Sequence, residues 1–431
     1  MRALLRAAAL LAAAAVPVVG GVPLAPARAA TSRCATTPDQ QVARPWQQSR
    51  LQPGRVWPLT RGAGVTVAVI DSGVDATSPH LRGAVDVGPD VLGRPGGGSG
   101  VDCSGHGTEV ASLVAGRVLA GTPFAGIAPE ARVLSIRQTE RLEQGQPRGT
   151  TNGMATAIRA AVAAGARVIN ISATAEGSTP ALKAAVDYAV AHDVVVVAAA
   201  GNDDGTRPAG DDGSTPPTYY PAAYPEVLAV AATDSADARA DTSHAADYVD
   251  VAAPGQQVVV AGANGPGRYA VVTGTSFATP LVAGTVALVR AYLPQLTAAQ
   301  VVARIEATAD APPAGRDAGV GAGVVDPYAA VTAVLPAEGA AGVHSAPPVA
   351  AAALPVPRHA HRTSLIGVVL AAAGLGAAAL LAVVALVLPR GRRRGWAPGR
   401  VTAPSAAGTL AAPRAEGADV LAGIRTSQGP R

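Results

Sequence analysis

The sequence predicts a doubly wound α/β domain, in which a mostly parallel sheet lies between helix layers. Short apolar runs alternate along residues 64–335 with alanine-rich stretches that are long enough for helices. The runs lack polar residues at alternate positions, a pattern typical of strands that are covered on both faces. Alternation of such strands with helices favours a parallel sheet, whose ligands bind beyond the carboxyl ends of the strands.

Five strands and three helices can be placed within this segment. The expected strands are the runs of mostly apolar residues Val65–Ile70, Arg132–Arg137, Val168–Ile171, Val194–Ala198 and Val227–Val230. The expected helices are the alanine-rich stretches Thr151–Ala164, Ala181–Ala191 and Ser276–Tyr292. Functional residues are therefore expected in the loops that follow these strands.

Composition and charge exclude several classes of protein. Of 431 residues, 49% are hydrophobic and only two are cysteines, which excludes disorder over the whole length and a disulfide-rich scaffold. Of the formal net charge of +4, residues 1–29 hold +3 and residues 389–431 hold +6, so residues 30–388 carry −5. A mildly acidic body gives no electrostatic support for binding nucleic acid.

The first 29 residues are typical of a secretory signal peptide. Arg2 and Arg6 precede an apolar stretch of about 13 residues, and Ala27-Arg28-Ala29 supplies small residues at the cleavage positions. The alternative of a long buried helix is disfavoured by the prolines and glycines that follow. We expect export of the chain, with residues 30–63 as an N-terminal extension.

A second apolar segment, Leu365–Leu388, has no charge and no proline over 24 residues. At about 1.5 Å per residue, a helix of this length can span a bilayer. Four arginines follow it closely and two precede it, so the positive-inside rule places the C-terminus in the cytoplasm. We expect a single-pass protein of the cell membrane, with the α/β domain on the extracytoplasmic side, where a disulfide would persist.

The other segments are assigned around this span. Residues 64–335 are the α/β domain. Residues 336–364 are rich in Pro and Ala, and prolines favour extended conformations, so we expect a linker. Residues 389–431 are expected to be a short basic cytoplasmic tail.

Three loops carry the side chains of a nucleophilic triad. VTVAVIDSGVD ends a strand at Asp71, SGHGTEVASLVAG places His106 between two glycines, and VVTGTSFATPLVAG places Ser276 at the start of a helix. A serine becomes nucleophilic when a base takes its proton, and an acid holds that base in the right tautomer. The start of a helix adds backbone N–H groups that a developing oxyanion requires. Pro280 follows early in the same helix, where we expect that no intrahelical hydrogen bond is lost.

Each loop taken alone has another interpretation. Asp71-Ser72-Gly73 could belong to an aspartic protease, but those enzymes need a second such loop and this chain has one. Gly-His-Gly could be a turn, and a serine at a helix start could be a cap. The order Asp, His, Ser on a predicted parallel sheet favours the triad.

On these residues, the segment from Gly64 to Leu335 resembles the subtilisin-like serine proteases, the subtilases. The stretches that carry the resemblance are VAVIDSGVD, GHGTEVA, VINIS, VVVVAAAGND, YPAAYPEVLAVAA, DVAAPG and GTSFATPLVAG. It implies a subtilisin-like, seven-stranded sheet and a serine endopeptidase that works through Asp71, His106 and Ser276 and an acyl-enzyme. It also implies that the side-chain amide of Asn202 donates to the oxyanion together with the Ser276 N–H.

Within the subtilases, the chain is most similar to the mycosins, membrane-anchored proteases associated with type VII secretion. The features that carry this are RPWQQSRLQPGRVWPLTRGAGVTVAVIDSGVD, the Asp102-Cys103 pair before Gly-His-Gly, SIRQTE and NISATA. The layout of signal peptide, protease, linker, single span and basic tail matches too. The resemblance implies an exported protein as substrate and a type VII secretion membrane complex as partner, and no nucleic acid.

Two expectations concern the N-terminal extension. Residues 30–63 are too few for the folding propeptide of many subtilases, so we expect a permanent strap rather than a removable inhibitor. Cys103 closely precedes His106, and its only possible partner within the chain is Cys34. A disulfide that closes a loop of about 70 residues would stabilise the fold by about 4 kcal/mol in the chain-entropy model, and would hold the strap beside the histidine.

The chain departs from the subtilase pattern at two places near the site. Many subtilases have Ser-Leu-Gly-Gly where this chain has Ser172-Ala173-Thr174-Ala175, a segment that lines the substrate cleft in the family. Thr174 and Ala175 restrict the backbone more than glycines do, so we expect narrow specificity. Glu109 adds a carboxylate within a turn of His106, where it either faces solvent or raises the pKa of the histidine.

An acidic loop containing Asp203, Asp204, Asp211 and Asp212 resembles a calcium site only loosely, because its carboxylates lack the regular spacing of such sites. We expect no metal ion and no cofactor.

Two hypotheses remain for the function. The first is a narrow-specificity endopeptidase that cuts exported proteins at the outer face of the membrane. The second is a structural stabiliser of a membrane secretion complex, in which cleavage is secondary.

Overall fold

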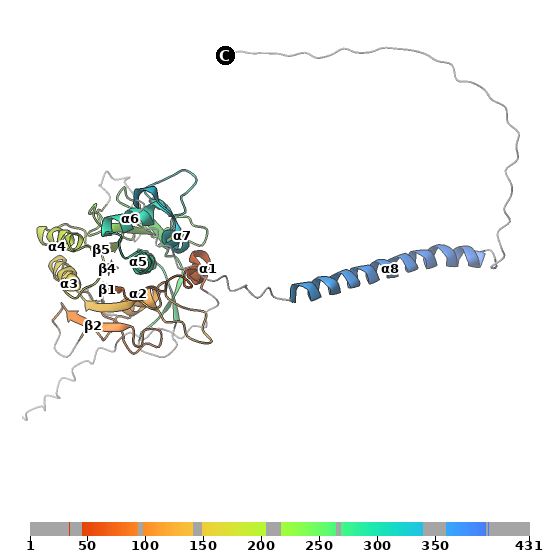
Figure 1. Cartoon of the computed structure of the whole chain (residues 1–431), viewed down its shortest axis with the longest axis horizontal. Helices are drawn as coiled ribbons and strands as arrows, with labels where there is room; N and C mark the ends of the chain where they lie inside the picture. The colour runs from red at the N-terminus through yellow and green to blue at the C-terminus, as the bar shows by residue number, and fades with distance from the viewer. Residues whose placement is uncertain are drawn as a thin grey trace, which may run out of the picture. The chain divides into compact units, whose positions relative to one another are not determined.

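The computed structural model describes residue 34 and residues 45–93, 98–140, 149–203, 217–263, 269–338, 359–393 and 395. The chain divides into two compact units, Met1–His344 and Ser345–Arg431 (Figure 1). The expected signal peptide, residues 339–358 of the expected linker and nearly all of the tail after Arg393 lie outside the described residues.

A seven-stranded sheet forms the centre of the first unit, in the order β2-β3-β1-β4-β5-β6-β7. All neighbouring strands are parallel, which confirms the predicted doubly wound, mostly parallel sheet. The strands are β1 (Thr66–Asp71), β2 (Val85–Asp90), β3 (Arg132–Arg137), β4 (Val168–Ile171), β5 (Val195–Ala199), β6 (Leu228–Thr233) and β7 (Val251–Pro254).

The five strands expected from the sequence are present, with ends that differ by at most three residues. The prediction missed β2 and β7 for separate reasons. β2 has the sequence VDVGPD, lies at the edge of the sheet and buries none of its residues, so it has no apolar run to detect. β7 has only four residues and ends at Pro254, and the proline lowers the strand propensity of this short segment.

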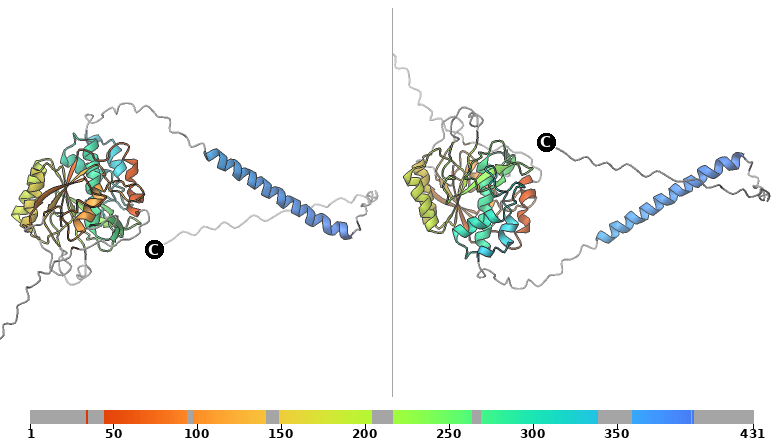
Figure 2. Two further views of the ribbon diagram at one scale, coloured as in Figure 1. Left: turned by 90° about the horizontal axis from the view of Figure 1, so that it is seen from below. Right: turned by 90° about the horizontal axis from the view of Figure 1, so that it is seen from above.

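Helices cover both faces of the sheet. In Figure 1, α3 and α4 lie on one side of it and α2 and α5 on the other, and the views in Figure 2 agree. The helices of the first unit, together with the 3₁₀ turns η1 and η2, are α1 (Trp46–Leu51), η1 (Pro53–Arg55), α2 (His106–Ala115), α3 (Thr151–Ala163), α4 (Pro180–Ala191), α5 (Thr275–Tyr292), α6 (Ala298–Ala307), α7 (Pro327–Thr332) and η2 (Pro336–Glu338).

Alternate residues of β1 enter separate cores, because successive side chains of a strand point to opposite faces. Val67 and Val69 belong to the core that contains residues of α2 and α5. Ala68 and Ile70 belong to the core that contains residues of α3 and α4. A strand that buries every residue needs no polar alternation, which explains the uninterrupted apolar run in the sequence.

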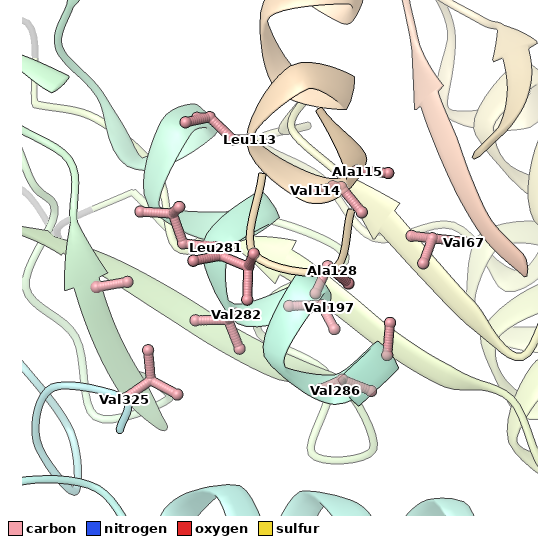
Figure 3. Close-up of a cluster of buried hydrophobic side chains, with 14 of the residues drawn as sticks. Val67, Leu113, Val114, Ala115, Ala128, Val197, Leu281, Val282, Val286 and Val325 are labelled. Atoms are coloured by element: carbon pink, nitrogen blue, oxygen red, sulfur yellow. The ribbon is translucent and has the colours of Figure 1, made fainter. Parts of the chain in front are cut away.

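The helix that carries Ser276 is anchored deep in the first unit. Of the 18 residues of α5, 15 are buried, and Figure 3 shows Leu281, Val282 and Val286 among valines of the sheet and side chains of α2. Each fully buried Leu or Val contributes roughly 1.5–3 kcal/mol relative to an exposed one. The start of α5 is therefore held rigidly at one end of the sheet.

The N-terminal extension packs against loops of the first unit. Gln47 Nε2 donates to the Val259 carbonyl at 2.6 Å, at the edge of the antiparallel pair β8 (Val258–Ala261) and β9 (Tyr269–Val272). The Trp57 indole N–H donates to the Ile127 carbonyl at 3.0 Å. Because these polar groups are satisfied by the domain, residues 45–57 form an integral part of its surface.

The end of the first unit reaches into the expected linker. Residues 336–338 form η2, and Glu338 Oε2 lies 2.5 Å from Arg304 Nη1 of α6. The second unit contains α8 (His359–Arg393), which extends beyond both ends of the expected span. Among the described residues, Gly374–Arg393 has a mean hydropathy of 1.8 with none of it buried, so this helix is long and apolar enough to cross a membrane.

Candidate active site

Asp71 is the last residue of β1, and its carboxylate contacts His106. Asp71 Oδ1 lies 2.7 Å from His106 Nδ1 and accepts a second hydrogen bond from the Ser72 N–H, also at 2.7 Å. Asp71 is fully buried, whereas the His106 side chain is 31% exposed. Because a carboxylate only accepts hydrogen bonds, the proton of the neutral imidazole sits on Nδ1, and Nε2 is left to accept a proton.

Two glycines allow His106 to approach Asp71. Gly105 precedes α2 with φ of 84°, a left-handed conformation that glycine adopts without strain. At Gly107, a Cβ atom would lie 2.1 Å from the backbone oxygen of Gly73, in the loop that follows β1. The Gly-His-Gly motif therefore reflects close backbone packing between that loop and the first turn of α2.

Asp102 holds the start of α2 and was missed as a site residue in the sequence. Its buried Oδ1 accepts from Ser72 Oγ at 2.9 Å and from the Gly105 N–H at 2.8 Å. Oδ2 accepts from the Thr108 N–H and hydroxyl at 2.8 and 2.7 Å. Burial raises the pKa of Asp102, and the Thr108 hydrogen bonds lower it in part. An acidic residue shortly before a helix start was the signal that could have identified it.

Ser276 is the second residue of α5 and exchanges hydrogen bonds with Ser172, which follows β4. Ser276 Oγ donates to the Ser172 carbonyl at 3.0 Å, and Ser172 Oγ donates to the Ser276 carbonyl at 2.8 Å. The second bond compensates for Pro280, which has no N–H to donate to the carbonyl four residues earlier. The expectation that Pro280 costs no intrahelical hydrogen bond is wrong, because α5 begins at Thr275 and Pro280 is its sixth residue.

The start of α5 lies beside His106. The Phe277 and His106 rings are tilted against each other with centroids 5.3 Å apart. In the described part of the chain, Ser276 Oγ makes its hydrogen bond to Ser172 and none to His106. Such bonds often tighten only when substrate binds, so this geometry is compatible with a base and its nucleophile.

Asn202 follows β5 and contacts the residue before Ser276. Its Oδ1 accepts from the Thr275 N–H at 2.9 Å and from Thr275 Oγ1 at 3.1 Å. A backbone N–H can only donate, so the contact identifies this side-chain atom as the amide oxygen. Nδ2 is therefore the group of Asn202 that remains available as a donor. The structure thus brings Asp71, His106, Ser276 and Asn202 to the carboxyl ends of β1 and β5 and the start of α2 and α5.

Three nearby carboxylates raise the pKa of His106. Burial lowers the pKa of His106, but the charge and hydrogen bond of Asp71 and the charges of Glu109 and Asp102 raise it to about 9. Burial also raises the pKa of Glu109 to about 7, against a lowering effect of His106. Of the two alternatives for Glu109, the structure favours the second: it is half-buried and its charge stabilises the imidazolium.

Cys34 and Cys103 form a disulfide, as predicted, across 69 residues of sequence. Cys103 adjoins Asp102, whose carboxylate anchors the first turn of α2. The disulfide therefore ties the N-terminal extension to the loop that positions His106.

Two other predictions concern loops near the site. Ala175, where many subtilases have glycine, pairs with Tyr220 through backbone hydrogen bonds of 2.9 and 2.8 Å. Asp204, Asp211 and Asp212 of the acidic loop lie outside the described residues. Asp203 is described, and its carboxylate lies 2.7 Å from His244 Nδ1. No group of three or more potential metal ligands occurs among the residues that the structure describes.

Comparison with known proteins defines the class. Residues 62–323 match the family described as Peptidase_S8, the subtilase family. This is more than half of the chain, so the protein belongs to the subtilases and is a subtilisin-like serine endopeptidase. Subtilisin E of Bacillus subtilis is 38% identical over 250 residues, covering 58% of this chain and 61% of that protein.

Within that family the chain is mycosin-like, as the sequence predicted. Mycosin-1 of Mycobacterium tuberculosis is 39% identical over 334 residues, covering 68% of this chain and 74% of the relative. Mycosin-4 of the same organism is 40% identical, covering 70% and 72%. The crystal structure of MycP1 from the ESX-1 type VII secretion system has a TM-score of 0.62 at 33% identity, covering 70% of this chain and 90% of that one. A chain of the periplasmic assembly from the ESX-5 inner membrane complex has a TM-score of 0.60 at 33% identity, covering 70% and 88%.

Proposed function

We propose that this endopeptidase hydrolyses peptide bonds through Asp71, His106 and Ser276, by way of an acyl-enzyme. The contact between Asp71 Oδ1 and His106 Nδ1 at 2.7 Å carries the proposal, because it orients the imidazole as a base. Substrate binding would release Ser276 Oγ from the Ser172 carbonyl, so that its proton passes to His106 Nε2 as Oγ attacks the scissile carbonyl carbon. The C–O bond forms as the carbonyl π bond breaks onto oxygen.

Asn202 Nδ2 and the backbone N–H of Ser276 would stabilise that oxyanion. The Ser276 N–H belongs to the first turn of α5, and the hydrogen bonds from Thr275 hold the Asn202 amide beside that turn before the reaction begins. Donors fixed in advance stabilise charge without reorganising, which makes them effective. When the intermediate collapses, the imidazolium would give its proton to the leaving amine. Water would then release the acyl group by the same steps.

Narrow specificity is proposed from the segment that follows β4. Ala175 pairs with Tyr220 through two backbone hydrogen bonds, so this segment is held in a strand-like bridge. Thr174 and Ala175 also restrict the backbone where many subtilases carry glycines. A constrained segment at this place adapts to fewer peptide sequences than a flexible one.

The proposed setting is the outer face of the cell membrane, with α8 as a single span and the C-terminus in the cytoplasm. Arg390, Arg392 and Arg393 in the last turn of α8 support this orientation. The similarity to mycosins, including the ESX-1 protease MycP1, supports a type VII secretion complex as partner and an exported protein as substrate. The geometry of the site does not favour a purely structural role.

A probe of reactive serines tests the mechanism directly. The full chain in detergent would be treated with an organophosphonate, and intact mass would be read for the wild type and for Ser276→Ala. We expect one adduct on the wild type and none on the variant. The proposed triad would be contradicted if the wild type stayed unlabelled while a cooperative thermal unfolding transition showed that it is folded.

A further inference from the structure

His244 and Asp203 form a side-chain pair beside Asn202 that the mechanism above does not use. His244 Nδ1 and Asp203 Oδ1 are 2.7 Å apart. The His244 side chain is 5% exposed and that of Asp203 is 44% exposed, so the pair joins the protein interior to its surface. Because Asp203 is the residue after Asn202, the contact limits how the backbone can move at Asn202.

The backbones of the same two segments are also paired. The His244 N–H donates to the Gly201 carbonyl at 3.1 Å, and the Asp203 N–H donates to the Thr242 carbonyl at 2.9 Å. Asn202 and Ser243 form an isolated antiparallel bridge. Residues 201–203 and 242–244 therefore run as a short ladder, and the contact between His244 and Asp203 closes it through side chains.

Tyr219 holds the other side of the same segment. Its ring meets the His244 ring at 88°, with centroids 5.0 Å apart, and its hydroxyl donates to the Asn202 carbonyl at 3.3 Å. A Cβ atom on Gly201 would lie 2.1 Å from Tyr219 Cδ2, so the ring lies directly against the Gly201 backbone. His244 thus contacts both the residue after Asn202 and the tyrosine that binds the Asn202 carbonyl.

We propose that His244 is a positioning residue for the Asn202 amide: it holds residues 201–203 so that Nδ2 stays directed at the developing oxyanion. This inference rests on the function proposed above. Oxyanion donors work because they are fixed before the reaction, and a displacement of about 1 Å can cost on the order of 100-fold in rate. Thr275 holds the amide oxygen of Asn202, and the ladder holds its backbone, so both ends of the residue are constrained.

A double-mutant cycle on the full chain in detergent separates positioning from a general structural role. The measured quantity is the second-order rate constant for labelling of Ser276 by a fluorophosphonate. We expect His244→Ala to slow labelling about tenfold, a part of the loss that follows removal of an oxyanion donor. In the Asn202→Ala background the same change should alter the rate less than about twofold, because residues that act through one another are not additive.

Two further variants control for folding and chemistry. Asp203→Ala removes the same contact from its exposed side and should reproduce the slower labelling, even if His244→Ala fails to fold. His244→Asn places an amide N–H near the position of Nδ1 and should recover most of the rate. An equal loss with and without Asn202 would overturn the inference while leaving the proposed function intact. A folded wild type without labelling at Ser276 would overturn the proposed function, and this inference with it.

Discussion

Ser172 and Ser276 bind each other through reciprocal hydrogen bonds, in which the hydroxyl of each donates to the backbone carbonyl of the other. One bond fills the place of the N–H that Pro280 lacks, and the other holds the proposed nucleophile before substrate binds. The loop after β4 and the start of α5 are therefore coupled at two points. This contact joins the segment that lines the cleft in subtilases to the serine that we propose as the nucleophile.

Ser172→Ala should lower the free energy of unfolding by about 1–3 kcal/mol, because it leaves the Ser276 carbonyl without its donor. Urea unfolding of the full chain in detergent measures this. Pro280→Ala is the matched control, since it restores an N–H four residues after that carbonyl. The cost of Ser172→Ala should therefore be smaller in the Pro280→Ala background. An equal cost in both backgrounds would contradict the compensating role of the Ser172 hydroxyl.

Ser276→Ala and Asn202→Ala should reduce turnover by different amounts. Loss of the serine in subtilisin costs about 10⁶ in turnover, and loss of the oxyanion-hole Asn costs on the order of 10²–10³. We expect the same ranking here, because the first change removes the nucleophile and the second removes one of two donors. Peptide hydrolysis at saturating substrate measures both. Equal losses would remove Asn202 from the oxyanion site.

The sequence predicts those parts of the site that depend on single residues with fixed chemistry. Asp71, His106 and Ser276 were identified because acid, base and hydroxyl each follow a strand or open a helix, and Asn202 was implied by the resemblance to the subtilases. The buried strands of the sheet could also be predicted from the sequence, since buried parallel strands are uninterrupted apolar runs. Within the described residues, the structure places each of these elements near its expected position.

What the sequence does not reveal depends on pairs of residues that are distant along the chain. The reciprocal contact of Ser172 and Ser276 spans 104 positions, and no local pattern marks it. His244 and Asp203 are 41 positions apart, and a lone histidine in a polar loop has no distinctive signal. Edge strand β2 was missed because an exposed strand needs no apolar residues.

Glu109→Gln should move the acid limb of the kcat/KM profile to lower pH. His106 acts as a base only when neutral, so the rate falls as pH drops through its pKa of about 9. Removing the Glu109 charge removes support for the imidazolium, and the pKa of His106 falls. At pH 8, where Glu109 with its pKa of about 7 is ionised, the variant should therefore be faster than the wild type.

The pH dependence of that difference provides the control. Below pH 7 the wild-type Glu109 is itself mostly protonated, so the two profiles should converge. Glu130→Gln, at a half-exposed residue paired with Arg61, removes one negative charge elsewhere and should leave the profile unchanged. A Glu109→Gln profile that coincides with the wild type at pH 8 would show that this carboxylate does not act on His106.

Cys34→Ser should destabilise the chain by about 4 kcal/mol, because the unfolded chain regains the conformational entropy that a closed loop of about 70 residues removes. Cys103→Ser should cost a similar amount, since either change opens the same disulfide. The double variant should cost no more than either single one, because the first substitution has already removed the bond. Unfolding by guanidinium without reductant measures the three values, and the wild type with reductant should match them.

Because Asp102 binds the first turn of α2 next to Cys103, we also expect slower probe labelling of Ser276 in the variants. Unchanged labelling with lost stability would show that the disulfide stabilises the fold without positioning His106.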